Sequence, residues 1–151
     1  MSEMLGNHYF QLKNFILAED TYERLLPAEL ANLKVKRKLI ICYTQTNKLS
    51  KALQLLIDLI EQDSSTIIQF NSREEDCPCN DLIFQIESGI ITYPLYQDSY
   101  LALGILWLYC NYRTSLNYFQ MAIKENPNND LLNKAFNLIK KLSKQNILQT
   151  N

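Results

Sequence analysis

Residues 5–22, LGNHYFQLKNFILAEDTY, are followed by a stretch of similar pattern at residues 39–56, LIICYTQTNKLSKALQLL. Equivalent residues lie 34 positions apart: Leu5 and Leu39, Tyr9 and Tyr43, Phe15 and Leu49, Ala18 and Ala52. A fixed period near this length, with large and small residues in register, is typical of stacked helical hairpins. The sequence therefore predicts an all-α chain built from repeated pairs of helices.

The composition favours a helical domain of ordinary size. The chain has 151 residues, of which 47% are hydrophobic and 21% charged, and it contains only 3 Gly and 4 Pro. Few helix breakers over this length favour helices. The net charge of −1 predicts no nucleic-acid partner. No apolar run is long enough to cross a bilayer, so we expect no membrane insertion. The first residues do not resemble a signal peptide, which predicts a cytoplasmic protein or a fragment of a larger one.

The first unit, about residues 1–30, has the clearest pattern. Apolar residues on its first helix share one face, Lys13-Asn14 makes the turn, and Pro27 ends the second helix. The unit resembles the tetratricopeptide repeat, which has a Leu-Gly pair, an aromatic, a small residue, a second aromatic, a second small residue and a closing proline. These places are taken here by Leu5-Gly6, Tyr9, Ala18 and Tyr22, and by Pro27. The resemblance implies a right-handed α-solenoid that binds other proteins.

Two further units keep this pattern. Residues 32–63 repeat it with Ile40 in place of Gly and Leu59 in place of the second small residue. Residues 96–129 repeat it with Tyr100, Leu103-Gly104, Trp107, Ser115, Phe119, Ala122 and Pro127. Small residues let the second helix of a hairpin approach the first, and aromatic residues fill the space between hairpins. We therefore expect both units to be hairpins of the same kind.

Residues 64–94 are the least regular part of the chain. They form either an insertion or a decayed third repeat, and we favour the repeat. A helix with Leu82, Ile83, Ile86 and Ile90 on one face is expected to be its second helix, with Gly89 as a small residue. Ser65–Asn71 would be the first helix, and residues 71–80 an exposed loop. These units and a capping helix at 130–145 make one domain, 1–146, with a flexible tail at 147–151.

The resemblance also implies a binding groove. In the family the first helix of each hairpin lines a concave surface, and matching by residue places Asn7, Phe10, Gln11, Lys34, Arg37 and Ile41 there. Lys34 and Arg37 could bind an acidic peptide or a C-terminal carboxylate, or could simply remain solvated. In the last unit the groove positions are Leu101, Ile105, Leu108 and Tyr109. This apolar set is either an exposed anchor for a partner or is covered, by residues 64–93 or by a second copy of the chain.

Some tetratricopeptide proteins clamp the C-terminal carboxylate of heat-shock chaperones with Lys, Asn and Arg side chains. Asn7 matches one of these positions, but Glu3 stands where the clamp has Lys, and Lys38 where it has Asn. The sequence therefore predicts no clamp of this kind.

Other candidates for chemistry are weaker than their structural alternatives. Cys77-Pro78-Cys79 could bind a metal or form a redox disulfide, but a structural zinc site needs four ligands. We expect Cys42 and Cys110 to be buried core residues and His8 to be a packing or surface residue without a catalytic partner. The cluster Glu74-Glu75-Asp76 with Asp81 lacks the spacing of a calcium loop. We expect no catalytic residue, no metal and no cofactor.

The sequence as a whole predicts a scaffold for protein–protein recognition, without enzymatic activity. The partner would be a protein or peptide bound in the concave groove. The alternatives are a self-associating subunit of a larger assembly, including a homodimer, and a thiol or metal site at Cys77 and Cys79.

Overall fold

The structure is a computed structural model of the chain, and it describes residues 3–26, 32–62 and 78–150. These residues form helices and connecting turns with no β-strand among them, which confirms the predicted all-α class. The helices of the described ranges are α1 (Glu3–Gln11), α2 (Phe15–Leu25), α3 (Leu33–Gln45), α4 (Leu49–Gln62), α6 (Cys79–Glu87), α7 (Tyr96–Trp107), α8 (Tyr112–Glu125) and α9 (Asp130–Thr150).

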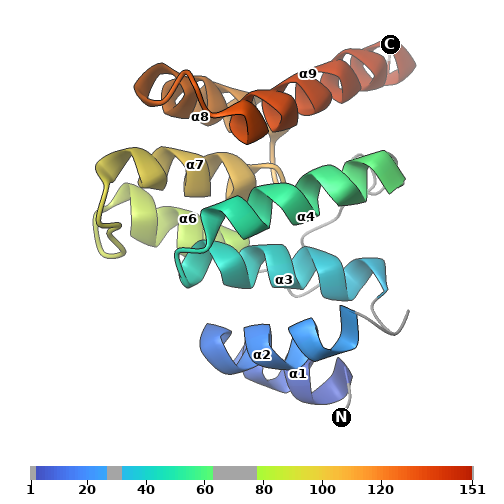
Figure 1. Cartoon of the computed structure of the whole chain (residues 1–151), viewed down its shortest axis with the longest axis vertical. Coiled ribbons are helices and arrows are strands. Elements are labelled where there is room, and N and C mark those ends of the chain that lie inside the picture. Colours follow the sequence, from blue (N-terminus) through green and yellow to red (C-terminus); the bar gives the residue numbers. More distant parts are fainter. Residues whose placement is uncertain (1–2, 27–31, 63–77, 151) are drawn as a thin grey trace.

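Three pairs of consecutive helices pack as hairpins: α1 with α2, α3 with α4, and α7 with α8. Figure 1 shows the first hairpin at one end of the molecule, the second hairpin next to it, and α8 and α9 at the other end. Helix α2 packs on α3, and α7 packs on both α3 and α4. The buried apolar side chains of all these helices join in one core.

Glycines allow the close helix contacts of the first and last hairpins. A Cβ atom added at Gly6 on α1 would lie 2.5 Å from the Tyr22 ring of α2. One added at Gly104 on α7 would lie 3.1 Å from the Phe119 ring of α8. Both rings are completely buried. The two glycines and the later aromatic residues therefore meet inside their hairpins, whereas we expected the aromatic residues to fill the space between hairpins.

The turns within the first two hairpins also repeat. Lys13 and Asn47 have positive φ angles of 60° and 56° and lie 34 residues apart. The left-handed conformation is uncommon for residues with a side chain, and asparagine adopts it more readily than most. Asn14 then caps α2, because its side-chain oxygen accepts a hydrogen bond from the backbone N–H of Leu17. The backbone therefore follows the same period as the sequence.

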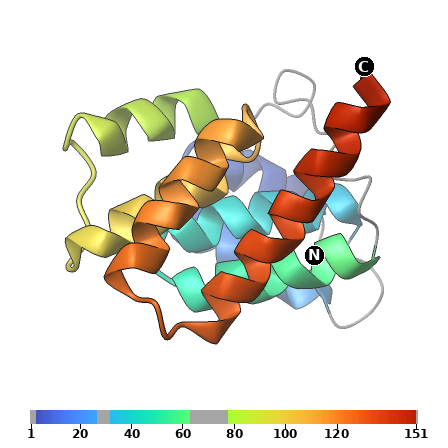
Figure 2. The ribbon, with the colours of Figure 1, turned by 90° about the horizontal axis from the view of Figure 1, so that it is seen from above.

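Helix α6 lies beside α7 (Figure 2). The helix expected over this region is present, and Leu82, Ile83 and Ile86 are buried as predicted. The predicted stripe ends sooner than expected: α6 stops at Glu87, so Gly89 adopts a positive φ of 82° in the following turn and Ile90 is exposed. The expected helix at 65–71 and most of the loop at 71–80 lie outside the described residues.

Helix α9 packs on both α8 and α4, and Figure 2 shows it crossing the molecule above α4. It begins at Asp130 as predicted but continues to Thr150, through the residues that we expected to form a flexible tail. Its buried side chains include Leu132, Ala135, Ile139 and Leu142. The exposed lysines Lys134, Lys140, Lys141 and Lys144 lie on the other side of the helix. This end of the molecule therefore presents a charged surface.

Candidate interaction surface

The predicted groove residues of the first two hairpins are mostly covered. Phe10 and Ile41 are buried, Asn7 and Arg37 are half-buried, and only Gln11 and Lys34 are exposed. The Phe10 ring of α1 packs against two rings of α2: its centroid lies 5.8 Å from that of Phe15 and 6.4 Å from that of Tyr22.

Asn7 is likewise engaged inside the molecule. Its side-chain oxygen accepts hydrogen bonds from the Tyr22 hydroxyl at 2.6 Å and the Lys38 ammonium at 3.2 Å. The bond from Tyr22 lies within the first hairpin, and the bond from Lys38 joins the second hairpin to the first, so little of the predicted basic groove is open.

The apolar patch predicted in the last unit is not an exposed anchor. Leu101, Ile105, Leu108 and Tyr109 are all buried. The Tyr109 hydroxyl donates a hydrogen bond to the backbone oxygen of Arg37 on α3 at 2.9 Å. Other helices of the chain cover this set, because α7 packs against α3, α4, α6 and α8, and of these only α6 lies within the segment 64–93 that we considered as its cover.

Helix α2 of the first hairpin contacts the second hairpin through a buried carboxylate. Glu19 on α2 is buried, and its carboxylate accepts a hydrogen bond from the Thr46 hydroxyl at 2.5 Å. The same carboxylate pairs with the Lys48 ammonium in the turn after α3, and this hydrogen bond raises the pKa of Lys48. Burial and the charge of Glu19 raise the pKa of the Cys42 thiol. An acidic group of α2 thus meets donors supplied by α3 and its turn.

Three residues of α3 face the first hairpin at intervals of four: Lys38, Cys42 and Thr46. The Lys38 ammonium bonds to Asn7 and lies 5.7 Å from the centre of the Phe10 ring. Residues spaced by four lie on one face of a helix. These three residues therefore define the side of α3 that the first hairpin covers.

The equivalent residues of α1, each 34 positions earlier, are Met4, His8 and Leu12. All three are exposed, and the relative solvent-accessible surface is 79% for Met4 and 65% for Leu12. Exposed large apolar residues continue onto the neighbouring positions Leu5, Ile16 and Leu17. We name Met4, His8 and Leu12 the α1 stripe. It lies on the terminal hairpin, which is covered by α3 on its other side.

Sequence reasoning missed this surface because it predicted only that the apolar residues of the first helix, Leu5 and Leu12 among them, share one face. The signal that could have found it is the period itself. On α3, one side packs against α2. In the described structure no helix covers the corresponding side of α1. Its residues at the covered positions of α3 are then exposed, and here two of the three are large and apolar.

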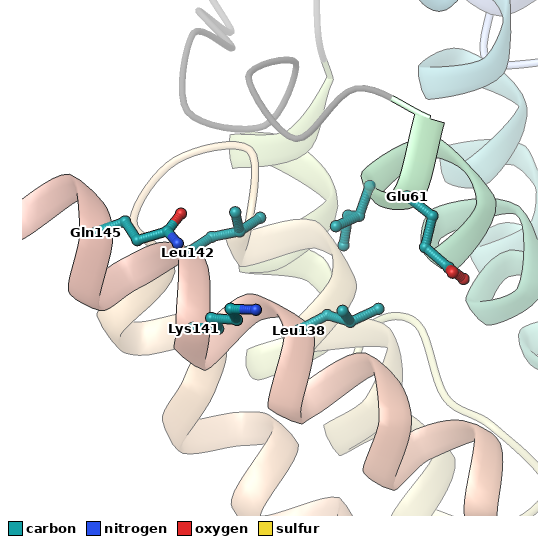
Figure 3. Close-up of a pocket in the computed structure, with 6 residues that line it drawn as sticks. Glu61, Leu138, Lys141, Leu142 and Gln145 are labelled. Atoms are coloured by element: carbon teal, nitrogen blue, oxygen red, sulfur yellow. The ribbon is translucent and has the colours of Figure 1, made fainter.

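The described surface also has open depressions, one of them on α8 at Asn117, Gln120, Met121 and Lys124. Another, of about 460 Å³, lies beside the turn of the first hairpin and is lined by Leu12, Lys13, Asn14, Phe15, Ile16, Gln45 and Thr46. It continues the exposed apolar surface at the end of the α1 stripe. A third, of about 200 Å³, lies between the end of α4 and α9 (Figure 3). Its charged rim of Glu61 and Lys141 encloses the apolar side chains of Ile60, Leu138 and Leu142.

Within residues 3–26, 32–62 and 78–150, the remaining candidates for chemistry form no metal site. Among the described residues no group of three or more His, Cys, Asp or Glu side chains is placed to hold a metal ion. Cys42 is buried as predicted, whereas Cys110 is exposed because α7 ends at Trp107 and Cys110 falls in the following turn. Cys79 is buried in the first turn of α6, and Cys77 lies outside the described residues.

Comparisons with protein-family models, curated proteins and solved structures found no match for this chain. Among the described residues, no helix is both long enough and apolar enough to cross a bilayer.

Proposed function

We propose that this chain is a non-catalytic scaffold for protein–protein recognition, and that its hairpins belong to one solenoid of the tetratricopeptide type. The 34-residue period, the Gly6–Tyr22 and Gly104–Phe119 contacts, and the repeated left-handed turns support this proposal. Repeat arrays of this kind present extended surfaces to partners, and their defining residues serve packing rather than chemistry.

The observation that carries the proposal is the exposed apolar surface of the first hairpin. Met4, Leu12 and Ile16 expose 79%, 65% and 72% of their surface. Large apolar side chains that gather on one face favour an interface, because covering them removes apolar area from water at about 25 cal/mol per Å². We therefore propose that the partner binds at this end of the molecule and not in the predicted groove, where most side chains are buried.

The experiment that tests the proposal compares partner capture by the wild-type chain and by the double variant Met4→Glu/Leu12→Glu. Both side chains point to solvent, so the fold should tolerate the changes, and circular dichroism and thermal unfolding check this. The matched control is Met121→Glu, since Met121 is an exposed methionine on α8. We expect the double variant to lose a protein that the wild type and the control both retain. Equal capture by all three would contradict the proposal.

Self-association is the second candidate, and the same exposed face supports it. Multi-angle light scattering of the wild-type chain and the double variant separates the two. A wild-type dimer that becomes monomeric in the double variant would identify the chain itself as the partner.

A further inference from the structure

We propose that the α1 stripe is equivalent to the face of α3 that packs against α2, and that this exposed stripe binds an amphipathic helix of a separate protein. This inference rests on the proposed function and names the class of partner. The expected docking mode is the packing of α2 on α3, because the α1 stripe holds the same positions one period earlier.

The first step is the equivalence of the two faces. Lys38, Cys42 and Thr46 contact the first hairpin, and subtracting one period gives Met4, His8 and Leu12. The flanking pair behaves in the same way: Leu39 is completely buried, whereas Leu5 is 38% exposed. The same positions are thus covered on α3 and uncovered on α1.

The second step is what α2 supplies to the covered face. Its buried residues include Glu19, which accepts a hydrogen bond from Thr46, and also Ala18 and Tyr22, whose ring packs on Gly6 of α1 as well. A small residue next to a large one allows the helices to approach while the ring fills the space beside them. A helix that covers α1 in the same way would carry a similar small and large pair on its apolar face.

The third step is the difference in chemistry between the two faces. On α3 the carboxylate of Glu19 is matched by Thr46 and Lys48. One period earlier these donors are replaced by Leu12 and Asn14, so a carboxylate would lose its ammonium partner there. Burying an unpaired carboxylate is strongly unfavourable. The partner helix should therefore have an apolar residue where α2 has Glu19.

Helices α2 and α9 offer no equivalent face of their own, and the exposed apolar residues Phe84 and Tyr96 stand on two different helices, α6 and α7. The packing side of α2 is already covered by α3, and the apolar side of α9 is buried against α8 and α4. The exposed side of α9 carries Lys140, Lys141 and Lys144, which do not complement an apolar stripe. The structure thus favours a helix of another protein over a head-to-tail contact between copies.

The probe is a pair of synthetic helical peptides based on residues 14–26. In both, a covalent bridge replaces the exposed ion pair between Asp20 and Arg24, which are one helical turn apart, so that the short peptide is held helical. One peptide keeps Glu19 and the other carries Glu19→Leu. Each is labelled and titrated with the full chain by fluorescence anisotropy.

We expect the Glu19→Leu peptide to bind at least about ten-fold more tightly than the Glu19 peptide, which corresponds to roughly 1.4 kcal/mol. Leu12→Glu in the chain should weaken this binding by at least about ten-fold, and Met121→Glu should leave it unchanged. A light-scattering measurement of the chain alone should show a monomer.

The inference is overturned if neither peptide binds, if both bind equally, or if Leu12→Glu has no effect. A dimer that Leu12→Glu disperses would also overturn it, because the occupant would then be a second copy. If the peptides fail but partner capture still requires Met4 and Leu12, the proposed function stands and only the class of partner is wrong.

Discussion

Helices α1 and α3 hold equivalent places in consecutive hairpins, and they differ in what covers them. The face of α3 that includes Cys42 continues to Thr46, whose hydroxyl donates a hydrogen bond to Glu19 of α2. The same face of α1 carries Met4, His8 and Leu12 and is exposed. The difference shows that positions one period apart are covered in the second hairpin and exposed in the first.

The two ends of the molecule support this interpretation. At the end formed by α9, apolar residues face inward and four lysines face outward. A polar outer face is what a terminal helix of a repeat array requires for solubility. The first hairpin lacks such a face, because Met4, Leu12 and Ile16 are exposed. One end of the described structure therefore presents lysines to solvent, and the other presents large apolar side chains.

The largest effect is expected from truncating the two equivalent leucines. Leu39 has no exposed surface, so Leu39→Ala should lower the free energy of unfolding by about 3 kcal/mol. Leu5 is 38% exposed, so Leu5→Ala should cost less than about 1 kcal/mol. Urea unfolding followed by circular dichroism measures both. Equal losses of unfolding free energy would mean that Leu5 and Leu39 are covered alike, which would contradict the difference between α1 and α3.

A smaller effect is expected at the glycines of the first and last hairpins. In Gly6→Ala the new Cβ would lie 2.5 Å from the ring of Tyr22, whose hydroxyl is held by Asn7, so the ring cannot move without cost. This change should destabilise the chain by about 1–2 kcal/mol, although alanine favours helix. At Gly104 the corresponding distance is 3.1 Å, so Gly104→Ala should be close to neutral. The reverse order in thermal unfolding would show that the first hairpin is the looser one.

The smallest effect concerns Cys42, which stands where α1 has the exposed His8. Burial raises the pKa of the Cys42 thiol above its ordinary value of 9.0, so the folded state favours the protonated form. The stabilisation from this shift is present below pH 9 and is lost as the pH rises further, by about 1 kcal/mol at pH 10. Cys42→Ala should flatten the decline in the urea midpoint between pH 9 and pH 10. An unchanged decline would rule out the thiol as its cause.

Much of the fold could be predicted from the sequence because packing residues repeat. Gly6 with Tyr22 and Gly104 with Phe119 meet inside their hairpins, and the turn at Lys13-Asn14 is where the pattern ends one helix and begins another. The end of α6 could not be predicted, because Ile90 keeps the helical spacing after the helix has ended. Helical spacing alone does not determine where backbone hydrogen bonding stops.

The candidate site was harder to predict because exposure depends on neighbours. Leu101 and Ile105 look like groove residues by position, but α7 packs on α3 and α4 and buries them. Leu12 looks like a core residue by spacing, but no helix of the described structure covers it. Both errors have one cause: periodicity tells which residues share a face, while the arrangement of hairpins decides whether that face is open.

The most direct test of the central claim is cross-linking from position 8, the middle of the α1 stripe. A photoreactive amino acid replaces His8 in one sample and the exposed Gln120 on α8 in a control. Each chain is irradiated with the bridged Glu19→Leu peptide, and the products are mapped by mass spectrometry. We predict cross-links from position 8 to the peptide around Ala18 and Tyr22, and none from position 120. Cross-links from both positions, or from neither, would contradict the assignment of the α1 stripe as a helix-binding face.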